Sequence, residues 1–232
     1  MARLRRIVMP GQPHLVIQRS HSAQDVFADA RDRDSYLACL GDAAREARVA
    51  IHAYGLLPHE VRLLATPDDT QGLSRLVQAT GRRFVRQFNQ RHGRSGTPWE
   101  GRFRSTVIEA GPHFLACLSF VEGLADAGAR AVLPGEAGAL HSSAGHHLAG
   151  RDDPLIQAHP GYWALGNTPF EREAAYRRFA AQPAQPQTVA AILHAALNGW
   201  VLGSDAFAAL VAEQAQRKTR PSAPGRRRKS GG

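Results

Sequence analysis

The sequence predicts an α+β fold, a ferredoxin-like sandwich in which helices pack on a central antiparallel sheet of about four strands. Strand and helix patterns follow one another as strand, helix, strand, strand, helix, strand, helix. Two βαβ-like halves of this kind are typical of such a sandwich. The middle two strands lie so close in sequence that they should pair as an antiparallel hairpin. With 232 residues and 43% hydrophobic content, the chain has material for one or two domains.

The N-terminal half supplies three of the strands. Residues 13–19 are a short run with a β-branched centre, which favours a strand. A polar turn over 25–34 precedes a helix over 36–47, where apolar residues recur at helical spacing. Strands are predicted over 49–57, ended by a proline, and over 61–65, ended by Thr-Pro.

A long helix over 70–91 follows, with an apolar face along its length. Two glycines and a proline make 92–99 a loop. Alternating residues predict the fourth strand over 102–109, and a helix runs from 111 to about 124.

The C-terminal part is predicted to be helical. The segment 123–150 is rich in glycine and alanine and is interpreted as a loop or a decayed segment. Helical patterns follow at 170–181, 188–197 and 205–216. The last stretch is of low complexity and should be disordered. The predicted division is a sheet domain, a C-terminal helical region and a basic tail, at 1–135, 136–216 and 217–232.

Arginine dominates the charge. The chain carries a net charge of +9, and 27 of its 29 basic residues are arginine. Residues 75–104 alone contribute +7, whereas 20–74 and 105–210 each contribute −4. A basic stripe on an acidic body indicates a polyanionic partner, most simply nucleic acid. Arginine suits this role because it binds phosphates with two hydrogen bonds and stacks on bases.

Several classes of protein are not expected. The only cysteines, Cys39 and Cys117, exclude a disulfide scaffold and a four-cysteine zinc site, and they fit a reducing cytoplasm. The sequence has no apolar run of membrane-spanning length, so no membrane partner is expected. No apolar stretch follows the basic start, so no secretory signal is expected.

Four stretches together resemble a known family. They are HAYGLLPHEVRLLATPDD at 52–69, VRQFNQRHGRSGTPWEGRFRSTVIE at 85–109, FLACLSFVE at 114–122 and YWALGNTPFEREAAY at 162–176. The chain resembles the REP-associated tyrosine transposases, insertion-sequence-200-like proteins of the HUH superfamily. The resemblance covers nearly all of residues 5–210, and the GTPWEGRFRS block is its most specific part.

The resemblance implies cleavage and rejoining of single-stranded DNA. In the family, two histidines two residues apart share one face of a strand and bind one Mg or Mn ion, which polarises the scissile phosphodiester. A tyrosine on a helix attacks the phosphorus and forms a 5′-phosphotyrosyl link. An asparagine four residues further on lies on the same helix face and acts as an auxiliary ligand.

This sequence departs from the family at each of these positions. Aligned without a gap, the metal-binding histidines fall on Glu60 and Arg62, and the asparagine before them falls on His59. The tyrosine falls on Phe120, which has no hydroxyl, and the auxiliary asparagine falls on Leu124. We therefore expect no metal cofactor here and expect the strand-transfer activity to be lost. Arg62 either fills the space of the metal and pairs with Glu60, or both residues are relics of drift at a solvated cleft.

Other residues do not obviously rescue the chemistry. His59 and Glu60 are adjacent and should face opposite ways on a strand. His52 is more typical of a core or edge residue than of a ligand, and the spacing of His146, His147 and His159 decides nothing. The remaining candidates are tyrosines away from the position of the attacking hydroxyl, namely Tyr36, Tyr54, Tyr162 and Tyr176.

The residues that would contact DNA are better preserved. Seven arginines should neutralise phosphates, and two aromatic residues should stack on unpaired bases. Trp99 has an equally good structural interpretation, as a plug between the loop and the edge of the fold. The predicted nucleic-acid-binding residues are Arg82, Arg83, Arg86, Arg91, Arg94, Trp99, Arg102, Phe103 and Arg104.

The preferred hypothesis is a cytoplasmic pseudoenzyme related to DNA transposition, which binds single-stranded or hairpin DNA and has lost its catalytic residues. A monomer and a homodimer both stay open. Three alternatives stay open: an active transposase that uses other residues than the family's own, an RNA-hairpin-binding protein, and a decaying gene product without function. Ferredoxin-like sheets also bind RNA, but the aromatic motifs of an RNA recognition motif are missing here.

Overall fold

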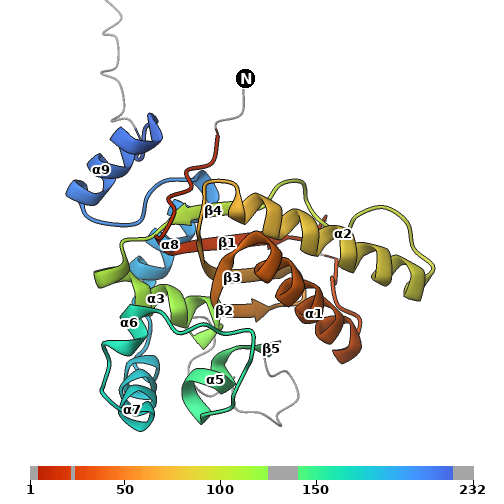
Figure 1. Ribbon diagram of the computed structural model, residues 1–232, viewed down its shortest axis with the longest axis horizontal. Coiled ribbons are helices and arrows are strands. Elements are labelled where there is room, and N and C mark those ends of the chain that lie inside the picture. The colour runs from red at the N-terminus through yellow and green to blue at the C-terminus, as the bar shows by residue number, and fades with distance from the viewer. Residues whose placement is uncertain (1–4, 22–23, 125–140, 222–232) are drawn as a thin grey trace, which may run out of the picture.

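A computed structural model describes residues 5–21, 24–124 and 141–221, and it confirms the predicted α+β sandwich. One antiparallel sheet has the strand order β4-β1-β3-β2-β5 (Figure 1). Every pairing within it is antiparallel, including the predicted β2–β3 hairpin. The strands are β1 (His14–Arg19), β2 (Val49–Leu56), β3 (Glu60–Pro67), β4 (Arg104–Val107) and β5 (His141–Ser142).

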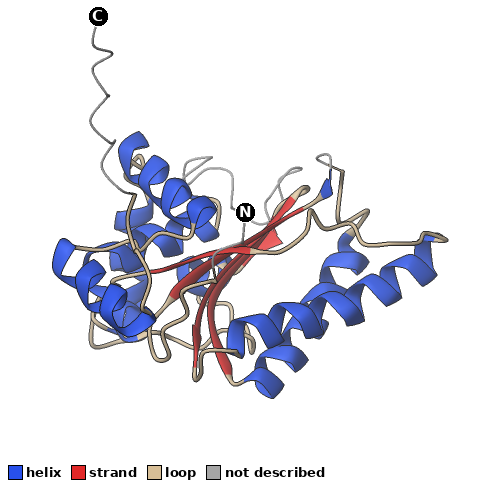
Figure 2. Cartoon of the chain, turned by 90° about the horizontal axis from the view of Figure 1, so that it is seen from above, coloured by secondary structure: helices blue, strands red, loops and turns tan. Residues whose placement is uncertain are grey.

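Helices cover both faces of this sheet (Figure 2). Side chains alternate between the faces because successive residues of a strand point in opposite directions. One face packs against α1 (Ala30–Ala47) and α2 (Gly72–His92). The other face packs mainly against α3 (Ala110–Val121), α7 (Pro169–Ala180) and α8 (Pro186–Asn198). The remaining helices are α5 (Ala144–Ala149), α6 (Pro160–Trp163) and α9 (Asp205–Ala215).

The chain differs from the sequence prediction at the start of α1. The helix begins at Ala30, inside the segment expected to be a polar turn. Asp29 caps it by accepting a hydrogen bond from the Asp32 backbone at 3.1 Å. Aspartate satisfies an otherwise unpaired amide at this position, so the polar residues start a helix instead of a turn.

The C-terminal part is more closely joined to the sheet than the sequence suggested. Two residues near its start form β5, a fifth strand beside β2. Side chains of α6, α7 and α8 share one hydrophobic cluster with α3 and the sheet. The predicted domain boundary at 135/136 lies outside the described residues.

The prediction of disorder from residue 217 onward is wrong for residues 217–221. Thr219 is buried, its carbonyl accepts from the Val201 amide at 3.0 Å, and its hydroxyl donates to the Ala208 carbonyl at 3.0 Å. The rest of that segment lies outside the described residues. Among the helices that the structure describes, none is long and apolar enough to cross a membrane.

Candidate nucleic-acid interface

Glu60 and Arg62 lie side by side on β3, on the face that α3 covers, as the alignment predicts. Arg62 Nε donates to Glu60 Oε1 at 2.7 Å, and Arg19 Nε on β1 donates to Glu60 Oε2 at 2.6 Å. Glu60 is 8% exposed and Arg62 is 7% exposed. The two side chains therefore form a buried ion pair, and the interpretation of a solvated cleft is wrong.

Phe120 of α3 packs against this ion pair. The Arg62 guanidinium lies 4.0 Å from the centre of the Phe120 ring, and its Nη1 donates to the Phe120 carbonyl at 2.9 Å. Phe120 is fully buried, and Leu124 beyond it is buried too. A cation over an aromatic face is attracted by the ring, the more so when it is desolvated. At Phe120 the structure thus places an arginine stacked on an apolar ring.

The end of α3 lies very close to the sheet at this point. A side chain on Gly55 of β2 would meet the Val121 carbonyl at 2.1 Å. Only glycine allows that approach, so β2 and α3 are held together without space for a DNA strand between them.

The residues around Glu60 do not fit the divalent metal that the family resemblance implies. Each carboxylate oxygen of Glu60 is bound to a guanidinium, and Arg62 adds a permanent positive charge. Within the described parts of the chain, no three His, Cys, Asp or Glu side chains come together as a metal cluster.

A second buried carboxylate, which the sequence did not reveal, lies two residues after Phe120. Glu122 is fully buried, and its Oε1 accepts from Ser143 Oγ at 2.7 Å and contacts His147 Nδ1 at 2.6 Å. Its Oε2 accepts from the Tyr176 hydroxyl at 2.8 Å. Burial, and then the Glu122 charge, raise the pKa of Tyr176 well above its usual value. This network joins α3 to α5 and α7, and leaves neither His147 nor Tyr176 available for catalysis.

The other rescue candidates also have structural roles. His52 Nδ1 contacts the Gln157 carbonyl at 2.6 Å, and its Nε2 contacts Thr66 Oγ1 at 2.8 Å. Burial lowers the pKa of His52 to about 4. His159 stacks on Phe114, with ring centres 4.1 Å apart, and His59 lies at the surface 3.3 Å from Asp25.

Three of the predicted DNA-contacting arginines remain available on the surface. Arg82 and Arg86 project from α2, and Arg102 lies in the turn before β4; all three are exposed. None of the three has an ion pair or a side-chain hydrogen bond to the described residues. Exposed guanidinium groups without a protein partner are suited to phosphates.

The other four predicted arginines are engaged with groups of the protein. Arg83 pairs with Glu46 on α1 at 2.7 Å. Arg91 pairs with Asp29 and, at 2.5 Å, with Asp32. We expect these ion pairs to lower their contribution to DNA binding. The remaining two make single hydrogen bonds, Arg94 to the Gln24 side chain and Arg104 to the Leu197 carbonyl.

Both aromatic rings that the sequence predicts to stack on bases are buried, and base stacking by Trp99 and Phe103 stays a prediction. Trp99 is 4% exposed and Phe103 is 7% exposed. The Trp99 ring packs against Tyr36, at 6.2 Å between ring centres, and Phe103 is covered by Arg6, whose guanidinium lies 3.6 Å from the ring centre. Trp99 therefore plugs the loop against the core, which is the structural interpretation that the sequence left open.

A groove of about 800 Å³ runs beside Arg82 and Arg102. Helix α2 forms one side, and β1 with the segment before β4 forms the other. Its lining is mostly apolar, with arginines at the rim. The lining residues that matter below are Gln18, Val77, Gly81, Arg82, Val85, Arg102 and Phe103.

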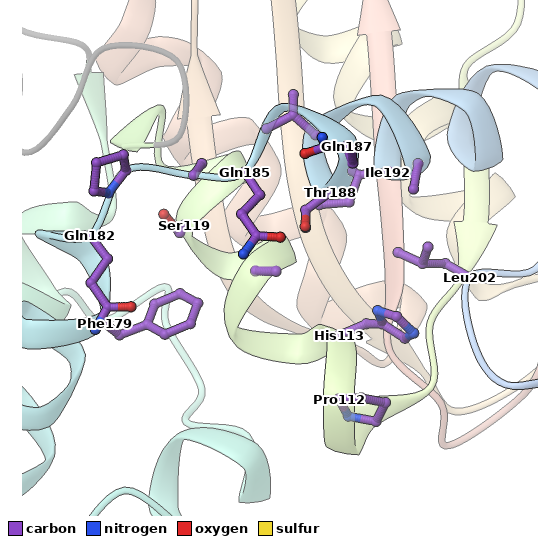
Figure 3. A pocket seen from close by; sticks show the side chains of 15 residues that line it. Pro112, His113, Ser119, Phe179, Gln182, Gln185, Gln187, Thr188, Ile192 and Leu202 are labelled. Carbon is purple, nitrogen blue, oxygen red and sulfur yellow. The ribbon is translucent and has the colours of Figure 1, made fainter.

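A second hollow, of about 530 Å³, lies on the opposite face of the sheet (Figure 3). It is formed by α3 and by the connection from α7 to α8, and Gln182, Gln185 and Thr188 point toward it. His113 is the only titratable side chain in its described lining. This hollow lacks the positive charge of the α2 side and offers no evident site for a phosphate.

No family model matches the chain, and no curated protein matches it. Among solved structures, the fold is similar to that of a REP-associated tyrosine transposase bound to a REP hairpin. The identity is 16% and the TM-score 0.48, over 68% of this chain and 92% of that chain. It is also similar to a protein from Deinococcus radiodurans described as a transposase, at 23% identity and TM-score 0.37, over 50% of this chain and 91% of that chain. Transposases are the class that the sequence resembles, but at TM-scores below 0.5 the functional proposal rests on the residues of this chain.

Proposed function

We propose that this protein binds single-stranded or hairpin DNA through the exposed arginines of α2 and the segment before β4, and that it does not cleave that DNA. The observation that carries the proposal is the contrast between two sets of arginines. Arg82, Arg86 and Arg102 are exposed without a partner among the described residues, whereas Arg62 is buried on Glu60 and Phe120.

The absence of cleavage follows from chemistry. Transfer through a phosphotyrosine needs a hydroxyl at the attacking position, and Phe120 has none. Polarising the phosphodiester through a metal needs free ligands, and the oxygens of Glu60 are bound to Arg19 and Arg62. We expect neither a metal cofactor nor a covalent intermediate.

Binding needs less than cleavage does. Phosphate contacts require only positive charge in the right place, and the exposed arginines supply it. The role in DNA transposition, the cytoplasmic location and a homodimer belong to the same proposal. Light scattering on the purified chain tests the dimer.

The test is a titration of labelled hairpin DNA with a single-stranded flank, at several salt concentrations. We expect binding that weakens steeply as salt rises, because arginine–phosphate contacts release counterions. An RNA of the same sequence serves as a competitor. Tighter binding of the RNA, or no binding of either at low salt, would contradict the proposal.

A further inference from the structure

We infer that the groove between α2 and β1 is a subsite for an unpaired nucleotide, whose base lies against the backbone of α2 at Gly81. The inference rests on the proposed function and adds to it a place where a base, and not only the phosphates, is bound.

The first observation is Gly81 itself. Glycine in the middle of a helix is less favourable than alanine in every measured host, and Gly81 lies near the middle of the 21-residue helix α2. A Cβ atom built there would meet nothing within 4 Å. Packing inside the described protein therefore gives no reason for glycine at this position, and the open space above it belongs to the groove.

The second observation is a side chain at the floor of the groove. Gln18 on β1 is only 7% exposed, lines the groove, and makes no side-chain hydrogen bond to the described residues. Its amide is not among the fully enclosed side-chain groups that lack a partner, so it is open toward the groove. A glutamine amide both donates and accepts, so it matches the edge of a nucleobase.

The other residues that line the groove indicate the chemistry of its ligand. Val77 and Val85 on α2 present apolar surface on the two sides of Gly81, and the rim carries the partner-free guanidinium groups of Arg82 and Arg102. An apolar slot lined by glutamine amides and guanidinium groups fits a flat ring with polar edges attached to phosphates. An unpaired nucleotide has this chemistry, whereas a paired base is enclosed in its duplex.

The inference predicts that stability and binding respond in opposite directions at Gly81. Gly81→Ala should raise the melting temperature by about 2–4 °C, since helix propensity improves. The same change should weaken binding of the flanked hairpin, and Gly81→Leu should weaken it further, by about 5- to 150-fold, the range for losing one stacked base.

Gly41→Ala is the matched control. Gly41 is also in the interior of a helix, α1, and its added Cβ would make only ordinary contacts, 3.7 Å from Leu155 and 3.9 Å from Arg45. It should gain stability without any loss of binding. A loss of binding equal to that of Gly81→Ala would overturn the inference.

A second probe separates this inference from the proposed function. It is the same hairpin with abasic residues throughout its flank, so the phosphates remain and the bases are gone. Wild type should bind the abasic probe more weakly than the normal one, and Gly81→Leu and Gln18→Ala should lose this discrimination. Gln90→Ala, a glutamine change on the α1 side of α2, should keep it.

The outcomes are distinct. If wild type binds both probes equally while the arginine variants lose binding, the base subsite is wrong and the proposed function stands. If the Gly81 variants keep the wild-type affinity, the subsite is equally wrong. If wild type binds neither probe at low salt, both proposals fall.

Discussion

Arg62 on one face of the central sheet and two arginines on the other face are in opposite states. On the face covered by α3, Arg62 is buried, paired with Glu60 and stacked on Phe120. On the α2 side, Arg82 and Arg86 are exposed and have no partner among the described residues. Catalysis needs a hydroxyl and a metal held in fixed geometry, whereas phosphate binding needs only charge and position. One fold can therefore lose the first and keep the second.

The largest expected effect is on the closed face. Arg62→Ala leaves Glu60 buried with a single partner and removes the hydrogen bond to the Phe120 carbonyl. Breaking a buried ion pair from one side costs about 3–5 kcal/mol, so we expect the free energy of unfolding in urea to fall by that order. Affinity for hairpin DNA, measured well below the melting temperature, should stay within about twofold, because no part of the arginine surface is altered.

On the α2 side we expect a large effect on DNA binding and a small effect on stability. Changing Arg82, Arg86 and Arg102 together to alanine should weaken DNA binding and flatten its salt slope by about 2, since each lost single-strand contact accounts for about 0.7. Stability should change by less than about 0.5 kcal/mol per exposed residue.

Arg83→Ala sharpens this prediction as a matched control. Arg83 lies on the same helix, next to Arg82, but pairs with Glu46 on α1. It should leave both the affinity and the salt slope nearly unchanged. An equal loss of affinity for Arg83→Ala would mean that DNA binding depends on the net positive charge of α2 and not on contacts by particular arginines.

A smaller effect is expected from low pH, which should lower the stability of the fold through a buried histidine of the sheet. His14 on β1 accepts from the Met9 amide through Nε2 at 3.1 Å, and its Nδ1 contacts the Gln12 carbonyl at 2.7 Å, an arrangement that suits the neutral ring. Burial lowers its pKa to about 4, against a usual value near 6.5.

Between these two pH values the unfolded chain holds a proton that the folded chain does not. Stability should therefore fall as the pH drops from about 6.5 toward 4, by up to about 1.4 kcal/mol per unit for this residue. The similarly lowered His52 adds to the same slope. His14→Gln should reduce the pH dependence of unfolding, and an unchanged slope would contradict this assignment.

The smallest effect is expected from restoring one catalytic group alone. Phe120→Tyr returns the hydroxyl but leaves Glu60 and Arg62 in place, so DNA cleavage should remain undetectable. Glu60→His combined with Arg62→His recreates two imidazoles on one face of β3, and binding of Mn²⁺ by this double variant would support the alignment. Cleavage by Phe120→Tyr alone would show that the face is not closed.

The sequence predicted the sheet and its order of elements because these depend on local patterns. It also anticipated the pairing of Glu60 with Arg62, since residues two apart share a strand face. It could not predict which arginines are free. Arg82 and Arg83 are adjacent in sequence, and only the packing of α1 against α2 engages one with Glu46 and leaves the other at the surface.

Other features depend on contacts between residues distant in the chain. Glu122 meets Ser143, His147 and Tyr176 only in the folded protein. The burial of Trp99, which lies in a loop, depends on Tyr36 of α1 and Phe84 of α2. Gly81 could have been found from the sequence, because a glycine inside a strongly periodic helix lowers helix stability and often has a packing or functional reason.

The central claim is that binding has outlived cleavage. Its most direct test incubates the wild-type protein with single-stranded hairpin DNA and Mg²⁺ or Mn²⁺, and measures the bound fraction, the cleaved fraction and any covalent protein–DNA adduct in the same samples. We predict salt-sensitive binding, intact DNA and no adduct. Cleaved DNA carrying a phosphotyrosyl adduct, or no binding at low salt, would contradict the claim.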